Sequence, residues 1–180
     1  MLKITIPEKE YFNEDTQEFV TTKSHELVLE HSLISISKWE SKWHKPFLSD
    51  KKKSDEEFLD YIKCMTLNNV PDENIYLSIT NENIRDILNY IDDEYTATTF
   101  SDKDTAETSK EIITSEIIYY WMILNEVPFE CQKWHINRLL TLIKVCSIKN
   151  MPSKKMSKND IFSQNTSLNK MRRAMLHSRG

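Results

Sequence analysis

The sequence predicts an α+β fold that is predominantly α-helical, with a small N-terminal antiparallel β-sheet followed by a helical bundle with a central helical hairpin. Two observations lead to this prediction. Within residues 1–31, apolar and polar residues alternate, as they do in half-buried strands. Within residues 32–150, apolar residues recur at the i, i+3, i+4, i+7 spacing of amphipathic helices. A chain of 180 residues can bury a substantial core, so residues 1–150 are predicted to form a single globular domain.

The β-rich part is predicted from four short segments. Residues 2–6 (LKITI) and 26–30 (ELVLE) alternate between apolar and polar side chains. Between them, residues 10–13 and 18–22 flank the polar sequence Glu14–Gln17, which suits a hairpin turn. These segments are therefore expected to form a small antiparallel sheet whose last strand leads directly into a helix.

That first helix is predicted over residues 33–44. Alternating serines in this segment would also suit a strand. However, Ile36, Trp39 and Trp43 fall at i, i+3 and i+7, which favours a helix that ends before Pro46.

The next two helices begin with recognisable caps. Ser54 opens a capping box with Glu57, and Thr80 is the N-cap of the following helix. Their apolar positions share one spacing: Phe58, Tyr61, Ile62 and Met65 in the first, and Ile84, Ile87, Leu88 and Ile91 in the second. Residues 93–108 are polar, with Phe100 as the one evident anchor, and are predicted to be an exposed mobile loop.

The strongest helical patterns cover Ser109–Leu124 and Glu130–Ile148. The first segment is apolar nearly all round from Ile117 to Leu124, which predicts a helix in the middle of the core. Only Asn125–Phe129 joins the two helices, and so short a connection predicts an antiparallel helical hairpin.

Residues 151–180 are expected to form a basic C-terminal tail. They hold seven basic residues and one acidic residue, a net charge of +6, which leaves −10 for residues 1–150. The sequence Ser157–Asp160 is suited to cap a final helix through Leu176, although the apolar face of that helix is thin. An acidic body with a basic tail suggests a tail that contacts a polyanion or an acidic protein surface. A solvated terminus is the alternative.

Glycine is absent before Gly180, the last residue. This excludes the glycine-dependent phosphate loops, dinucleotide fingerprints and nucleophile elbows of many enzymes. It also predicts that helices end with Asn, Asp or no special cap, because glycine is the usual left-handed residue at these positions.

Carboxylates do not form an evident catalytic pair. The carboxylates of residues 92–94, and those of Asp102 and Asp104, lie in polar stretches, where nothing would separate their pKa values. Glu116 lies in the predicted core helix and is expected to form a structural ion pair with Arg138 or Lys133. We therefore predict no catalytic residues, no cofactor and no enzymatic activity.

Cysteine and histidine give no complete metal site. Cys131 and His135 are four residues apart on a predicted helix, which places them on one face, but zinc needs three or four protein ligands. Cys64, Cys131 and Cys146 lie in apolar patterns, which predicts buried, reduced thiols in a cytosolic protein. No signal peptide is expected, and the longest apolar run, Ile117–Leu124, is too short to span a membrane.

The tryptophan residues are the last candidates for a functional site. The segment Trp39–Lys45 (WESKWHK) mixes aromatic and basic residues, a combination that suits a protein interface, although tryptophan more often packs in a core. The candidate partner-binding residues are two in this segment and four in the tail: Trp39, Trp43, Lys154, Lys155, Arg172 and Arg173.

Several segments resemble the tail assembly chaperones of tailed bacteriophages, particularly those with long tails. The segments are Leu29–Leu48, Asp60–Thr66, Ile112–Lys149, Lys154–Ser157 and Leu168–Leu176. The resemblance implies a non-enzymatic protein of the host cytoplasm that binds the tape measure protein and helps to recruit tail tube subunits. Such proteins usually leave before the tail is finished, so the mature virion is expected to lack this one. The frameshifted extension common in this family cannot be seen in a single protein product.

Two other functions fit the same residues. A structural virion component, such as a connector or tail-completion protein, would have a similar composition. A packaging or regulatory factor would bind nucleic acid through the basic tail, and its affinity would fall steeply with salt. The acidic body argues against nucleic acid as a partner, and self-association is compatible with the sequence.

Overall fold

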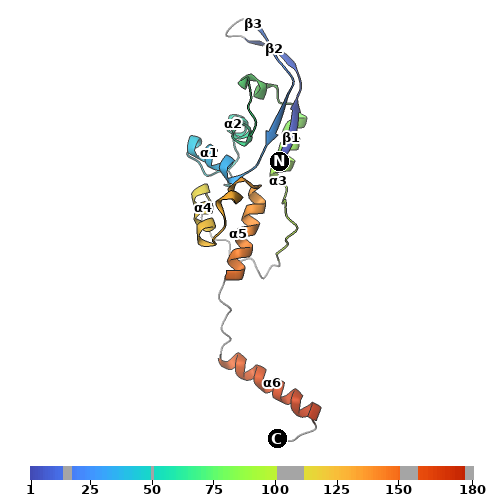
Figure 1. The fold of residues 1–180 in the computed structure, drawn as a ribbon, viewed down its shortest axis with the longest axis vertical. Coiled ribbons are helices and arrows are strands. Elements are labelled where there is room, and N and C mark those ends of the chain that lie inside the picture. The colour runs from blue at the N-terminus through green and yellow to red at the C-terminus, as the bar shows by residue number, and fades with distance from the viewer. Residues whose placement is uncertain (14–17, 50, 101–111, 151–157, 177–180) are drawn as a thin grey trace. The chain divides into compact units, whose positions relative to one another are not determined.

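The computed structural model describes residues 1–13, 18–49, 51–100, 112–150 and 158–176 (Figure 1). It divides into two compact units, Met1–Lys149 and Asn150–Gly180, and each is described by itself. The first unit, called the body below, joins an N-terminal β-hairpin to a set of helices. This arrangement confirms the predicted α+β, mainly helical fold class.

The N-terminal strands form one long antiparallel hairpin. The strands are β1 (Leu2–Ile6), β2 (Lys9–Asn13), β3 (Glu18–Thr22) and β4 (His25–Leu29). β1 pairs with β4, and β2 pairs with β3 in the same register. The pairing is interrupted at Pro7, which has no N–H to donate. The β2–β3 end extends beyond the helices (Figure 1). The predicted turn at residues 14–17 lies outside the described residues.

The first helices match the predicted ones. They are α1 (Leu33–Trp43), α2 (Asp55–Met65) and α3 (Asn81–Asp92), with a 3₁₀ helix, η1 (Glu73–Ser78), before α3. Ser54 and Thr80 form capping boxes, which confirms the predicted starts of α2 and α3. On α3 the buried face is made by Asn83, Ile87 and Tyr90, whereas the expected stripe residue Leu88 is exposed.

The free edge of β4 is covered by the last residue of α2 and the chain that follows it. The Leu67 N–H donates to the Val28 carbonyl at 2.8 Å, and the Glu30 N–H donates to the Met65 carbonyl at 3.0 Å. The side-chain oxygen of Asn68 accepts from the Val28 N–H at 2.9 Å. Covering this edge satisfies backbone groups that would otherwise be free to pair with another chain.

The second half of the body departs most from the prediction. Helix α4 spans Ser115–Leu124, so the predicted start at residue 109 is wrong at least for residues 112–114, which are not helical. Residues 109–111 lie outside the described part of the chain. The expected long helix from Glu130 is also wrong: the chain first forms a 3₁₀ helix, η3 (Phe129–Lys133), and α5 follows as Ile136–Asn150.

Backbone pairing to a distant segment explains the late start of α5. The Ile136 N–H donates to the carbonyl of His31 at 2.8 Å, and Ser32 forms an antiparallel bridge with His135. An extended backbone at Trp134 lets the chain meet this partner before it turns into α5. The spacing of apolar residues in the sequence cannot predict this pairing between distant segments.

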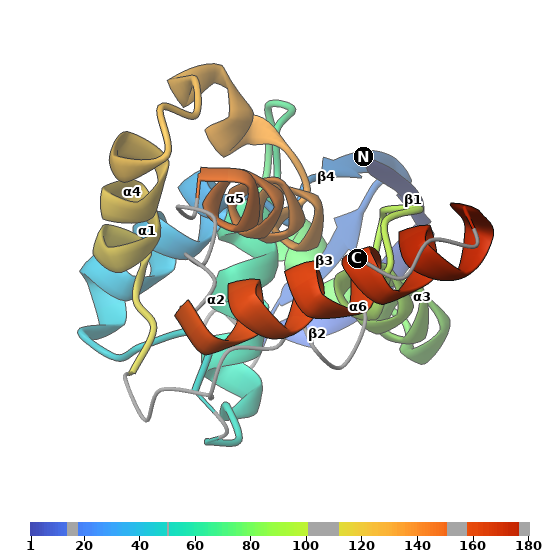
Figure 2. The ribbon, with the colours of Figure 1, turned by 90° about the horizontal axis from the view of Figure 1, so that it is seen from below.

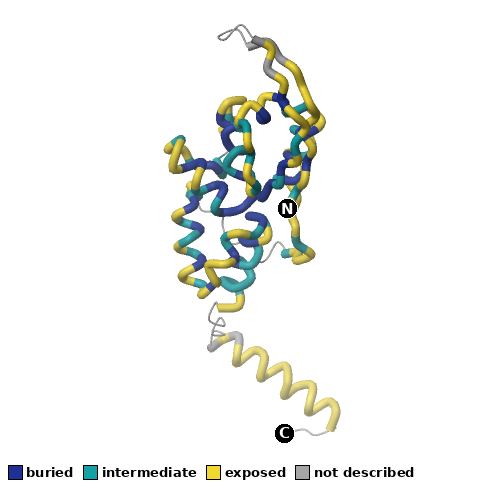
Figure 3. Tube along the Cα trace, turned by 45° about the horizontal axis from the view of Figure 1, so that its top comes forward, coloured by how far each residue is buried: buried dark blue, intermediate teal, exposed yellow. Residues whose placement is uncertain are grey.

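The predicted central position of α4 is also wrong. Its buried residues are Ser115, Ile118 and Met122, and the helix packs beside α1 (Figures 1 and 2). The core is one cluster built by β1, β4, the helices α1 to α3 and residues of α5 such as Ile136 and Leu139, and α4 adds only Ile118 and Met122 to it (Figure 3).

Within the described part of the chain, three residues other than glycine occupy left-handed backbone positions: His44, Tyr95 and Glu126, with φ of 54°, 53° and 54°. His44 is the C-cap of α1, and its N–H donates to the Glu40 carbonyl. The expectation that helices would end with Asn, Asp or no special cap is therefore wrong at His44. Sterically, a side chain at such a position costs about 1–2 kcal/mol relative to right-handed backbone.

The substitution His44→Gly is therefore expected to raise the free energy of unfolding by about 0.5–1 kcal/mol, after the greater flexibility of glycine in the unfolded chain is subtracted. Urea denaturation measures this change. The matched control is Ser41→Gly, within α1, which should lower stability by a similar amount. A loss of stability in His44→Gly would show that the imidazole itself contributes to the cap.

The second unit contains α6 (Lys158–Leu176), which matches the predicted final helix. The side chains that the structure describes on α6 are exposed. Among the described helices of both units, none is both long and apolar enough to cross a membrane.

Candidate partner-binding surfaces

Trp39 belongs to the core and not to the surface. Its side chain is 1% exposed, and its ring packs edge-on against Phe47 with centroids 5.2 Å apart. The indole N–H donates to the carbonyl of Glu57 at 2.8 Å, which ties α1 to α2. This position leaves no ring face for a partner, so the structure does not support Trp39 as a partner-binding residue.

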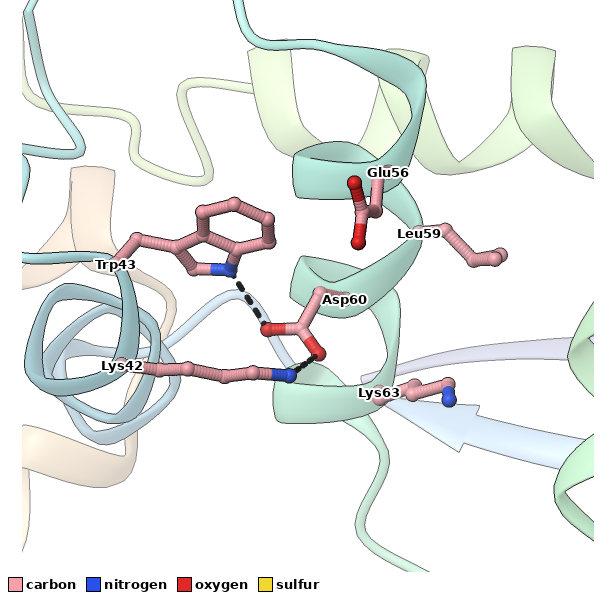
Figure 4. A pocket seen from close by; sticks show the side chains of 6 residues that line it. All are labelled: Lys42, Trp43, Glu56, Leu59, Asp60 and Lys63. Carbon is pink, nitrogen blue, oxygen red and sulfur yellow. Dashed lines mark hydrogen bonds and ion pairs between the residues drawn. The ribbon is translucent and has the colours of Figure 1, made fainter.

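Trp43 is half-buried and lines a shallow pocket of about 310 Å³ between α1 and α2 (Figure 4). Its indole N–H donates to Asp60 Oδ2 at 2.9 Å. Lys42 forms an ion pair with the other carboxylate oxygen of Asp60. The pocket is lined by Lys42, Trp43, Glu56, Leu59, Asp60 and Lys63. Because Asp60 is already held by two donors, it has the role of a fixed structural carboxylate.

The same two donors determine the charge state of Asp60. Burial alone would raise the pKa of Asp60, but the hydrogen bonds from Lys42 and Trp43 outweigh burial and hold the pKa below its usual value. A carboxylate with a lowered pKa in the folded state stabilises the fold above its unfolded pKa of about 4. That stabilisation is lost as pH falls through the lower folded pKa.

The variant Asp60→Asn is therefore expected to lose less stability on acidification than the wild type. Urea denaturation at several pH values, from about 7 to about 2, measures the slope. Trp43→Phe removes only the indole hydrogen bond and should give an intermediate slope. Identical slopes for the wild type and Asp60→Asn would contradict this account of the Asp60 pKa.

The four basic candidates fall in the second unit. Arg172 and Arg173 are exposed on α6. Lys154 and Lys155 lie outside the described residues. Their proposed contacts with a partner stay predictions.

A buried cluster of histidines and tyrosines was missed by the sequence analysis. The rings of His31 and His135 lie 5.0 Å apart, and both side chains are buried. His31 Nδ1 hydrogen-bonds to the hydroxyl of Tyr61, and His135 Nε2 donates to the carbonyl of Tyr90 at 2.9 Å. Burial, with smaller contributions from His135 and Lys53, lowers the pKa of His31 to about 3. His31 is therefore neutral at physiological pH and acts in packing.

Cys131 and His135 do not share a helix face, because Cys131 lies in η3 and His135 lies beyond its end. Among the described residues, no group of three or more His, Cys, Asp or Glu side chains is arranged to hold a metal ion. Cys131 is buried, while Cys64 and Cys146 are partly buried. Burial raises the pKa of Cys64 and Cys131, which disfavours the reactive thiolate.

Glu116 differs from its predicted role. It is exposed in the first turn of α4 and forms no ion pair with Arg138 or Lys133 among the described residues. The guanidinium of Arg138 instead lies over the Trp134 ring, 4.2 Å from its centroid. Glu116 is exposed because its helix has only one buried face.

Four large apolar side chains of this region are exposed, and we call them together the α4 surface: Tyr120, Ile123, Leu124 and Phe129. Their exposed fractions are 59%, 63%, 63% and 52%. Tyr119 connects η3 to α4, since its hydroxyl donates to Gln132 Oε1 at 2.9 Å and its ring lies 6.4 Å from that of Phe129. The sequence signal was the all-round apolarity of the segment, which indicates either central burial or an exposed binding face.

Comparisons with known proteins find no relative of this chain. No protein-family model matches the sequence, and no curated protein matches it. No solved structure matches either. A functional proposal therefore depends on the surfaces described above and on the sequence resemblance.

Proposed function

We propose that this protein is a non-enzymatic bacteriophage morphogenesis factor, a tail assembly chaperone that binds the tape measure protein and the tail tube protein. It acts in the host cytoplasm and leaves before the virion is complete. The observation that carries the proposal is the α4 surface, where four large apolar side chains are more than half exposed. Contiguous apolar patches of this kind are typical of protein-binding sites.

The exposed apolar side chains of the α4 surface support a binding role. A chaperone must cover apolar helices of its client while staying dissolved itself. The α4 surface offers aromatic and aliphatic side chains on a short helix that is anchored to α1 through its opposite face. The resemblance supplies the identity of the clients, since Ile112–Lys149 is among its matching segments and contains the whole α4 surface.

Co-expression with the tape measure and tail tube proteins of the same phage, followed by affinity capture, tests the proposal. We expect both proteins to be retained with the wild type. The variant Ile123→Ser/Leu124→Ser should retain less of at least one of them, because it removes apolar contact area. The matched control is Leu77→Ser/Leu88→Ser, which changes two exposed leucines of η1 and α3.

Capture of neither protein by the wild type would overturn the proposed function. Mass spectrometry of purified virions provides a second test. Presence of this protein at stoichiometric copy number would make it a structural component of the virion instead.

A further inference from the structure

Three apolar side chains of the α4 surface form a line along α4, which we call the ridge. Tyr120, Ile123 and Leu124 occupy positions i, i+3 and i+4, so their side chains lie along one face of the helix. Phe129 extends the same apolar area onto η3, through its contact with Tyr119. A second helix with an apolar stripe can pack lengthwise against such a ridge, as helices do within proteins.

Acidic side chains border this ridge. Glu116 lies one helical turn before Tyr120, Glu126 follows α4, and Glu130 follows Phe129. All three are exposed, and none forms an ion pair within the described part of the chain. Lys133 is the one basic residue within η3. Lys45 lines a pocket together with Glu116, but its ammonium is paired with Glu57. The apolar ridge therefore has a net negative border.

We infer that the α4 surface binds an amphipathic helix whose apolar stripe is flanked by lysine or arginine. The apolar stripe would cover the ridge, and the basic flanks would meet Glu116, Glu126 and Glu130. This inference rests on the proposed function and gives the chemistry of the client segment. Charge complementarity of this kind selects among partners that are equally apolar.

Two designed helical peptides test the inference directly on the full chain. Both carry leucine at i, i+3, i+4 and i+7 positions, and their remaining positions are lysine in one peptide and glutamate in the other. Fluorescence anisotropy should show binding of the Leu/Lys peptide at least about tenfold tighter than of the Leu/Glu peptide. The preference should weaken as salt is added.

Matched variants locate the binding site. Ile123→Ser/Leu124→Ser should weaken binding of the Leu/Lys peptide, whereas the control Leu77→Ser/Leu88→Ser should not. Glu126→Lys/Glu130→Lys should remove or reverse the preference for lysine. Glu8→Lys, a charge reversal at an exposed residue between β1 and β2, should have little effect. Circular dichroism verifies that each variant is folded.

Several results would overturn the inference. One is equal binding of the two peptides, and another is a charge preference that Glu126→Lys/Glu130→Lys leaves unchanged. A third is a wild-type dimer in analytical ultracentrifugation that Ile123→Ser/Leu124→Ser converts to a monomer, because a second copy would then occupy the surface. If tape measure capture persists while the peptide preference fails, only this inference is wrong. If the peptide preference holds without tape measure capture, only the proposed function is wrong.

Discussion

Replacing Trp39 with alanine is expected to lower the free energy of unfolding by about 4 kcal/mol. The indole is almost completely buried and packs against Phe47, so its removal leaves a large cavity between α1 and α2. The substitution also leaves the Glu57 carbonyl without its hydrogen-bond donor. Chemical denaturation of the full chain measures the loss.

Trp43→Ala is the matched control for Trp39→Ala. Trp43 lies one helical turn further along α1 but is only half-buried, so its loss should cost less than half as much. Trp39→Phe should fall between the wild type and Trp39→Ala, because it keeps most of the ring and loses the hydrogen bond. Equal costs at the two tryptophans would mean that Trp39 is not the core residue of the pair.

The second large effect is expected at Glu40, whose variant Glu40→Ala should lose about 3 kcal/mol of stability. The buried carboxylate of Glu40 accepts from the Phe47 N–H at 2.7 Å and from the Ser115 N–H at 2.8 Å. Ser115 begins α4, and the N-cap residue Thr114 makes no side-chain cap. Glu40 therefore supplies from α1 both a hydrogen bond and a negative charge for the N-terminus of α4.

Two further variants separate the contributions of Glu40. Glu40→Gln keeps one acceptor oxygen and should lose less stability than Glu40→Ala. Glu116→Ala removes an exposed carboxylate from the same end of α4 and should cost less than about 1 kcal/mol. If Glu116→Ala were as damaging as Glu40→Ala, the first turn of α4 would be held by its own acidic residue and not by α1.

The hairpin and the first three helices could be predicted from the sequence because their signals are local. Alternation identifies the strands, and the capping boxes at Ser54 and Thr80 mark the starts of α2 and α3. The exposure of α4 could not be predicted. A helix that is apolar all round has no pattern to tell which face is covered, and only the packing against α1 decides it.

The surroundings of single residues were harder to predict than the elements. His31 and His135 are about a hundred positions apart, and their contact depends on the backbone pairing between their segments. Trp39 and Trp43 share one sequence motif, yet one faces the core and the other the rim of a pocket. The left-handed His44 shows that a missing glycine need not mean a missing left-handed cap.

The pairing of His31 and Ser32 with His135 and Ile136 cannot form during synthesis until the chain has been made as far as Ile136. The ribosome delivers the chain from the N-terminus, so the hairpin and α1–α3 can associate while α5 is still unmade. Until α5 emerges, the backbone groups near His31 lack their partner, and the apolar residues that α5 later covers face water. The core of the body is therefore complete only after α5 has been made.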